Sequence, residues 1–126
     1  MSAGDEPRRL LVVEDEAALA KVLQMRLQME GFEVDVAGDG AEAMETIRAR
    51  RPDLVVCDLM MPVMDGVEVT RAVKGDPELK AIPILILTAL KSEKEMEELR
   101  RLGAEAFASK PYDGKALTAQ IRELLA

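Results

Sequence analysis

Short apolar runs alternate with amphipathic segments along most of the chain. Compact apolar runs are typical of buried β-strands, and apolar residues spaced three and four apart are typical of helices. The pattern predicts five strands, over residues 10–13, 33–37, 54–57, 82–87 and 106–108. A helical segment follows each of them. This alternation predicts an α/β fold, with a parallel sheet covered by helices on both faces.

The predicted helices have clear ends. The first carries Leu19, Val22, Leu23, Leu27 and Met29 at helical spacing. Its end is set by Gly31, and the fourth helix ends at Gly103. Glycine is the usual residue just past a helix end. Residues 1–7 are polar and lack periodicity, which predicts a disordered tail before a single domain over residues 8–126.

Composition and charge exclude several classes of function. The 126 residues suit one domain, and a net charge of −7 argues against direct nucleic-acid binding, which needs a basic surface. No apolar run approaches the roughly 20 residues that span a bilayer, so we expect no membrane partner. The one cysteine, Cys57, cannot form an internal disulfide, which suits a reducing cytoplasm. The absence of histidine excludes histidine-based catalysis and histidine metal ligands.

Polar side chains follow four of the predicted strands. Glu14 and Asp15 follow the first, Asp58 ends the third, Thr88 ends the fourth and Lys110 follows the fifth. A carboxylate at the end of a buried strand costs free energy unless something there uses it. Because parallel strands joined by right-handed crossovers end at one edge of the sheet, we expect these groups to share one crevice.

The three carboxylates of this crevice need compensating positive charge. At about 4 Å, each like-charge pair costs about 4 kcal/mol at an effective dielectric constant near 20. Lys110 supplies one positive charge, and a divalent cation would supply more. Hard oxygen ligands favour Mg²⁺, which often bridges carboxylates to a phosphoryl group. With the hydroxyl of Thr88 added, the residues are typical of phosphoryl transfer, and an ionised aspartate can be the nucleophile.

Four short motifs follow one another along the chain. They are residues 12–16 (VVEDE), 58–66 (DLMMPVMDG), 88–89 (TA), and the stretch from Gly103 through Phe107 to Lys110-Pro111. In these motifs the chain resembles the receiver domain of two-component response regulators, the CheY-like superfamily. The resemblance covers essentially residues 8–126. It implies a flavodoxin-like receiver fold with strand order 2-1-3-4-5, and a role in phosphorelay signal transduction.

The resemblance implies a phosphoacceptor and a metal site. Asp58 would accept a phosphoryl group from a phosphohistidine on a sensor histidine kinase or a histidine phosphotransfer protein. Asp15, Asp58 and the backbone carbonyl of Met60 would bind Mg²⁺ directly, and Glu14 would reach it through water. Glutamate in place of aspartate at that last position is a common variant of the family pattern.

It also implies a switch. Lys110 would pair with the phosphoryl oxygens, and the Lys110–Pro111 peptide bond would be cis. Thr88 would bond the new phosphoryl group while Phe107 turns inward. The face made by the fourth helix, fifth strand and fifth helix would then repack and control a protein target or an attached output domain. Receivers often form homodimers through their last two helices, so a homodimer is a further expectation.

Two other classes of function compete with a phosphorylatable receiver. A metal-dependent phosphohydrolase would usually carry a second acid two residues after the nucleophile, where this chain has Met60. An interaction module that is never phosphorylated usually lacks an acid or the lysine, and this chain keeps them. We therefore expect no enzyme activity beyond self-phosphorylation and self-dephosphorylation. Because Met60 and Leu90 are apolar and flank the path of water in this family, we also expect a long-lived phosphoryl-aspartate.

Overall fold

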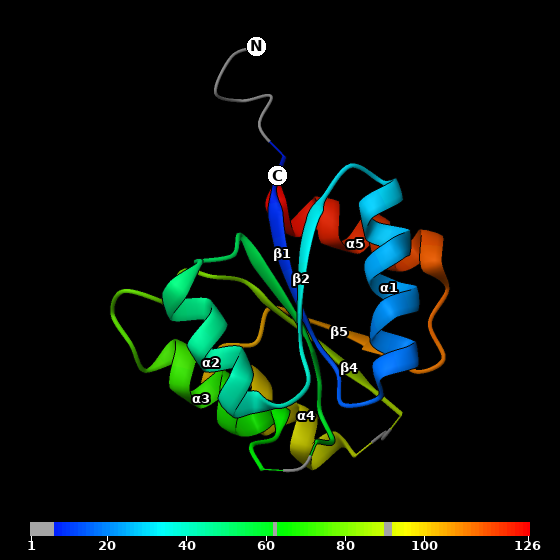
Figure 1. The fold of residues 1–126 in the computed structure, drawn as a ribbon. Coiled ribbons are helices and arrows are strands. Elements are labelled where there is room, and N and C mark those ends of the chain that lie inside the picture. The colour runs from blue at the N-terminus through cyan, green and yellow to red at the C-terminus, as the bar shows by residue number, and fades with distance from the viewer. Residues whose placement is uncertain (1–6, 62, 90–91) are drawn as a thin grey trace.

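The computed structural model describes residues 7–61, 63–89 and 92–126. Its centre is a five-stranded sheet in the order β2-β1-β3-β4-β5, with every neighbouring pair parallel (Figure 1). The strands are β1 (Arg9–Val13), β2 (Glu33–Ala37), β3 (Leu54–Asp58), β4 (Ile84–Thr88) and β5 (Ala106–Ser109). The predicted fold class and strand order are confirmed. The predicted tail lies outside the described residues except for Pro7, which is exposed.

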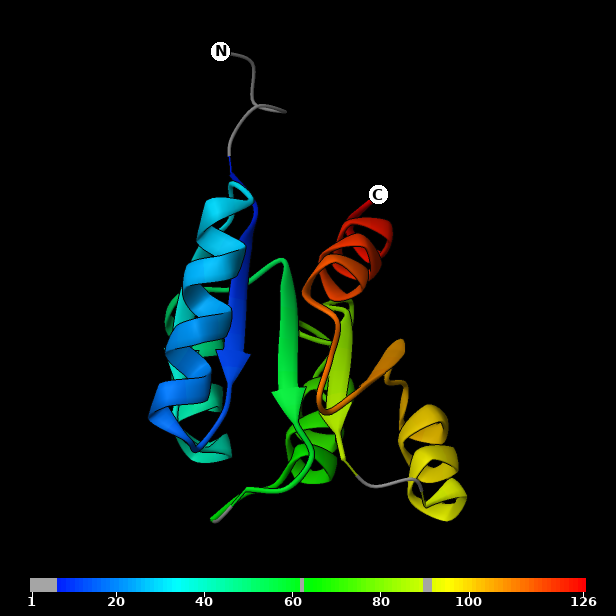
Figure 2. The same ribbon diagram turned by 90° about the vertical axis from the view of Figure 1, so that its right-hand side faces the viewer.

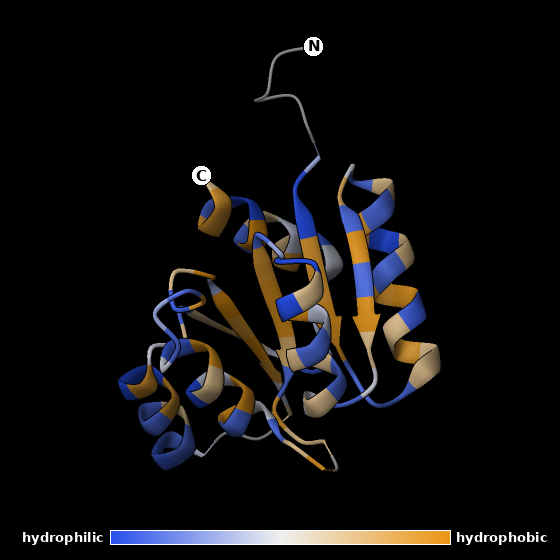
Figure 3. Cartoon of the chain, turned by 60° about the vertical axis from the view of Figure 1, so that its left-hand side comes forward, coloured by the Kyte–Doolittle hydropathy of each residue, from blue (hydrophilic) through white to orange (hydrophobic). Residues whose placement is uncertain are grey.

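Two helical layers cover the sheet. The helices are α1 (Ala17–Met29), α2 (Gly40–Ala49), α3 (Gly66–Lys74), α4 (Glu93–Leu102) and α5 (Gly114–Leu125). Helices α1 and α5 lie on one face, and α2, α3 and α4 lie on the other (Figures 1 and 2). Each face has its own apolar cluster: Leu23 of α1 and Leu117 of α5 belong to one, and Val69 of α3 and Leu99 of α4 to the other. The strands are mostly hydrophobic, whereas the helices alternate between polar and apolar (Figure 3).

Several predicted strand ends differ from the structure by one or two residues; β1 begins at Arg9, β3 ends at Asp58 and β4 ends at Thr88. The fourth strand begins at Ile84 instead of Ile82, although the Pro83 carbonyl already accepts a hydrogen bond of 3.0 Å from the amide of Val55. Proline has no N–H to continue a ladder, which restricts it to the start of a strand. The fifth strand extends one residue further than predicted, to Ser109, which pairs with Thr88. The longer pairing brings the end of β5 to the same edge as the end of β4.

The exposed face of α1 differs from the prediction. The buried residues of this helix are Ala20, Leu23 and Leu27. Leu19 and Val22, which were expected on the core side, are 45% and 61% exposed, and Met29 is also exposed. The helix has two adjacent apolar stripes, and the one that carries the small side chain of Ala20 packs on the sheet.

Helix ends follow the predicted signals. Asp65 caps α3, and its side chain accepts a hydrogen bond from the amide of Glu68 while Glu68 bonds back to the Asp65 amide. This reciprocal pair is a capping box. Gly31 and Gly103 have φ of 97° and 113°, a left-handed conformation that favours glycine. In the part of the chain that the structure describes, no helix is long and apolar enough to cross a membrane.

Candidate functional site

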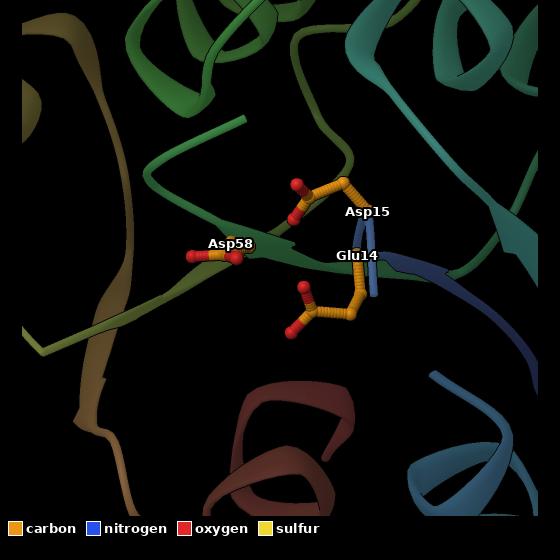
Figure 4. Close-up of side chains that lie close together, drawn as sticks. All are labelled: Glu14, Asp15 and Asp58. Carbon is orange, nitrogen blue, oxygen red and sulfur yellow. The ribbon is translucent and has the colours of Figure 1, made fainter. Parts of the chain in front are cut away.

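The carboxyl ends of β1 and β3 place three acidic side chains together. Val13 of β1 pairs with Cys57 of β3, so the residues that follow them, Glu14 and Asp58, lie side by side at the carboxyl edge of the sheet. Asp15 follows Glu14 directly. One carboxylate oxygen from each of the three lies within 4.8 Å of those of the other two (Figure 4). The predicted convergence of these acids is therefore present.

The three carboxylates differ in burial and in hydrogen bonding. Glu14 and Asp58 are each only 6% exposed, whereas Asp15 is exposed. Glu14 Oε2 accepts a hydrogen bond from the amide of Glu16 at 3.2 Å, and Asp58 Oδ1 accepts one from the amide of Met60 at 3.3 Å. These two amides compensate part of the negative charge.

Lys110 bridges the two buried acids. Its Nζ donates to Glu14 Oε1 at 2.7 Å and to Asp58 Oδ2 at 3.0 Å. Burial of the ammonium lowers the pKa of Lys110, but the hydrogen bonds and charges of Glu14 and Asp58 outweigh it, so that this pKa lies above its ordinary value. Lys110 is therefore a cation at neutral pH. Its charge compensates one of the three carboxylates.

The strand pairing of β4 and β5 positions Lys110 and the two residues of the predicted switch. The Lys110 amide donates to the carbonyl of Thr88 at 3.0 Å, and the Lys110–Pro111 bond is cis, as predicted. Thr88 is 6% exposed and lies at the carboxyl end of β4, on the edge that carries the acids. Phe107 pairs with Ile86, further back along the sheet, and its ring packs against the apolar cluster under α2, α3 and α4.

A close backbone approach fixes the turn after Asp58. The amide of Gly66 donates to the carbonyl of Leu59 at 2.9 Å. A Cβ atom at Gly66 would lie 2.8 Å from the Asp58 carbonyl oxygen and 2.9 Å from the Leu59 Cα, so this position requires glycine. In the same turn, Val63 has a φ of 69°, and Met60 is 62% exposed. Leu90, the other residue expected to flank the path of water, lies outside the described residues.

Cys57 takes no part in the chemistry of the site. Burial raises the pKa of its thiol far above the ordinary value, and the charges of Asp58, Asp65 and Glu14 raise it further. Because the thiolate is the reactive form, the thiol is inert at neutral pH. Cys57 packs as a small apolar residue, as its place in the buried strand predicted.

The site is accessible from the side of α1 and of the loop after β5. A cavity of about 620 Å³ lies there, lined by Glu14, Leu19, Lys110 and Tyr112 among others. Partial burial raises the pKa of the Tyr112 phenol, so that it is neutral at physiological pH. The cavity thus reaches Glu14 and the bridging ammonium of Lys110.

The donor set fits a hard divalent cation. The three candidate ligands all offer carboxylate oxygens, one of the three residues is exposed to water, and the single charge of Lys110 leaves net negative charge at the site. Oxygen ligands with room for water are what Mg²⁺ prefers. The three acids at this edge of the sheet could therefore hold a divalent cation.

One contact near the predicted switch was not foreseen from the sequence. The guanidinium carbon of Arg100, in the last turn of α4, lies 5.1 Å from the centroid of the Phe107 ring. In the sequence, Arg100 is one charge among many in a polar helix. Only the packing of α4 against β5 brings it to the ring.

Comparisons with known proteins agree on one family. The protein-family model described as the response regulator receiver domain matches residues 10–122 of this chain. The DNA-binding response regulator MtrA of Mycobacterium tuberculosis is 40% identical over 118 residues, covering 94% of this chain and 50% of MtrA. The chain thus spans about half the length of the curated relatives it matches.

Solved structures give the same result. The chemotaxis protein CheY4 of Vibrio cholerae is 32% identical, with a TM-score of 0.90 over 95% of this chain and 100% of CheY4. The receiver domain of a signal transduction histidine kinase from Syntrophus aciditrophicus is 33% identical, with a TM-score of 0.87 over 94% of this chain and 89% of that one. The fold, the cluster of acids at the edge of the sheet and the family match all indicate the same family. The chain belongs to the receiver-domain family of two-component response regulators.

Proposed function

We propose that the chain accepts a phosphoryl group on Asp58 in a reaction that requires Mg²⁺. One observation carries this proposal: three carboxylate oxygens converge within 4.8 Å, and Lys110 Nζ bridges the two buried ones. Asp15, Asp58 and the backbone carbonyl of Met60 would hold the cation, with Glu14 reaching it through water. When bound, Mg²⁺ would neutralise charge on the phosphoryl oxygens.

The transfer needs no general base. An ionised Asp58 oxygen attacks the phosphorus of a phosphohistidine, the new O–P bond forms, and the P–N bond breaks with its electron pair returning to the imidazole. Lys110, already within 3.0 Å of Asp58, is placed to bond the arriving phosphoryl oxygens. The donor would be a sensor histidine kinase or a histidine phosphotransfer protein.

The phosphorylated state would be detected through Thr88 and Phe107. The Thr88 hydroxyl would bond a phosphoryl oxygen, and the Phe107 ring would turn toward the space that the hydroxyl leaves. This is a local charge event acting on a packed element that has two arrangements. The face made by α4, β5 and α5 would then bind a protein target or an attached output domain. A homodimer through α4 and α5 stays a prediction.

One relative suggests a DNA-binding output for a protein that contains this chain. MtrA is named as a DNA-binding regulator, and this chain covers only half of it. We infer that any DNA binding by a protein that contains this chain would come from a separate domain, because the net charge of this one is −7. The chain itself would catalyse only its own phosphorylation and dephosphorylation.

Intact mass spectrometry after incubation with acetyl phosphate and Mg²⁺ tests the proposal. We expect a mass gain of one phosphoryl group, and no gain with Asp58→Ala or with EDTA. Glu97→Gln, an exposed acid on α4, is a control that should be phosphorylated normally. A gain that persists in Asp58→Ala would contradict the assignment of the acceptor.

A null result in that assay is resolved by a phosphoryl mimic. Beryllofluoride with Mg²⁺ should bind the unaltered chain and shift the backbone amide resonances of the switch region. Binding without measurable phosphorylation would mean fast dephosphorylation, contrary to the long lifetime expected from the apolar Met60. No binding would favour an interaction module that is never phosphorylated.

A further inference from the structure

A cation from α4 lies over the ring of Phe107. Arg100 is exposed on the last turn of the helix, and its guanidinium carbon is 5.1 Å from the ring centroid. A guanidinium at this distance is attracted by the negative face of the ring. At an exposed site, such a contact is worth about two- to fivefold in an equilibrium constant. It therefore favours the ring position that the structure shows.

The strand register places Phe107 on the same side of the sheet as Thr88. Phe107 pairs with Ile86, and Thr88 follows two residues later in β4. Because side chains alternate between the two faces of a strand, Phe107, Ile86 and Thr88 share one face. A ring that turned toward Thr88 would move along this face toward the acidic edge, and away from the end of α4.

The backbone around the ring is fixed at one end. Lys74 Nζ is 2.6 Å from Glu105 Oε2, and Glu105 Oε1 accepts a hydrogen bond of 2.8 Å from the amide of Ile84. Lys74 Nζ also donates to the carbonyl of Ile82 at 2.8 Å. These bonds attach the start of β5 to β4 and α3. The side chain of Phe107 can therefore change its rotamer without a shift of the strand that carries it.

Helix α4, by contrast, is held weakly. Leu99 is the buried residue that anchors it, and the other described residues of the helix are exposed or half-buried. Because few apolar contacts hold this helix in place, a single contact at its last turn contributes measurably to its position.

We propose that Arg100 is an autoinhibitory latch: its guanidinium holds the Phe107 ring at the end of α4, and the contact breaks when Asp58 is phosphorylated. This inference rests on the proposed function, because it assumes that the ring turns toward Thr88 in the phosphorylated state. The latch lowers the population of the switched state before phosphorylation. Its removal shifts that population without a change at the acidic site.

Beryllofluoride affinity in the presence of Mg²⁺ measures the latch. Arg100→Ala should bind this phosphoryl mimic about two- to fivefold more tightly than the unaltered chain. Arg101→Ala removes the same charge from the same helix turn and is the matched control, which should bind as the unaltered chain does. In a Phe107→Leu background, Arg100→Ala should have no effect, because the latch acts through the ring.

Nuclear magnetic resonance gives a second, independent measurement. The δ-methylene protons of Arg100 should be shifted upfield by the ring in the unphosphorylated chain, and the shift should vanish with beryllofluoride. Equal affinities of Arg100→Ala and Arg101→Ala, or a ring shift that persists with beryllofluoride, would overturn the latch alone. Failure of the unaltered chain to bind beryllofluoride would overturn the proposed function, and the latch with it.

Discussion

Replacing Asp58 with asparagine should stabilise the metal-free protein, although it removes the proposed phosphoryl acceptor. The Asp58 carboxylate is 6% exposed, and one of its oxygens lies within 4.8 Å of an oxygen of Glu14, which is equally buried. At this upper limit of 4.8 Å, the repulsion is at least about 3.5 kcal/mol at an effective dielectric constant near 20. Asp15 is exposed, so that its repulsion is screened to about 1–2 kcal/mol.

The attraction to Lys110 is of similar size. Its Nζ lies 3.0 Å from Asp58 Oδ2, which corresponds to about 5.5 kcal/mol on the same scale. The charge–charge terms therefore cancel to within about 1 kcal/mol, and desolvation decides the sign. A buried carboxylate loses several kcal/mol of hydration, which the isosteric amide avoids. The amide oxygen can still accept a hydrogen bond from Lys110, whereas the Met60 amide loses its acceptor on Asp58 Oδ1, so we expect the net gain to be limited to about 1–2 kcal/mol.

Urea unfolding at pH 7, followed by circular dichroism, measures this gain. In EDTA, Asp58→Asn should have the higher free energy of unfolding. In Mg²⁺ at about 100 times its dissociation constant, the unaltered protein gains about 2.7 kcal/mol by linkage, and the order of the two proteins should reverse. Glu97→Gln, on the exposed side of α4, should change the stability by no more than about 0.5 kcal/mol in either buffer.

Two outcomes would refute this reasoning. If Asp58→Asn were the less stable protein in EDTA, the ion pair with Lys110 would outweigh the repulsion and the desolvation. If Mg²⁺ stabilised both proteins equally, Asp58 would not be a ligand of the cation.

Three further predictions concern the surroundings of the site. Gly66→Ala should lower the free energy of unfolding by about 2–3 kcal/mol and weaken Mg²⁺ binding, because its Cβ would lie 2.8 Å from the Asp58 carbonyl oxygen; unchanged stability in urea would contradict the close approach. Val63→Asn should raise the free energy of unfolding by about 0.5–1 kcal/mol, since the φ of 69° is costly for valine and the side chain is 79% exposed. A lower free energy of unfolding would mean that Val63 makes contacts that the turn needs. Burial raises the pKa of Tyr112 above its ordinary 10.0, so the unfolded chain releases the phenolic proton first and stability should fall as the pH rises past 10.0. Tyr112→Phe should reduce that fall, and because Tyr112 is the one tyrosine of the chain, phenolate absorbance reports its titration alone.

The acidic site was predictable because its signal is local. Buried apolar runs that end on acids, as at Glu14 and Asp58, need only the rule that parallel strands end at one edge. The bridge by Lys110 followed in part from charge balance. That Lys110 Nζ bonds Glu14 Oε1 and Asp58 Oδ2 depends on the register of β1, β3 and β5, which no local sequence pattern encodes.

The orientation of α1 and the contact of Arg100 could not be predicted in this way. Leu19, Val22 and Met29 fit helical spacing as well as the true core stripe does, and periodicity alone does not choose between adjacent apolar stripes. The packing of the helix on β1 and β2 makes that choice. Arg100 and Phe107 belong to a helix and a strand separated by a turn, so their contact depends on the angle between α4 and the sheet.

The charge balance of the site also explains why the proposed transfer would require a divalent cation. Before transfer, one ammonium, that of Lys110, is shared between Glu14 and Asp58 at 2.7 and 3.0 Å. A phosphoryl group brings up to about two negative charges near pH 7, and it would add them to a cluster that is already under-compensated. Lys110 could then follow the phosphoryl oxygens only by leaving Glu14 unpaired, and a buried unpaired carboxylate costs several kcal/mol. A dication held by the same carboxylates would remove this conflict, which is why EDTA should abolish phosphorylation even though every side chain that touches Asp58 is still in place.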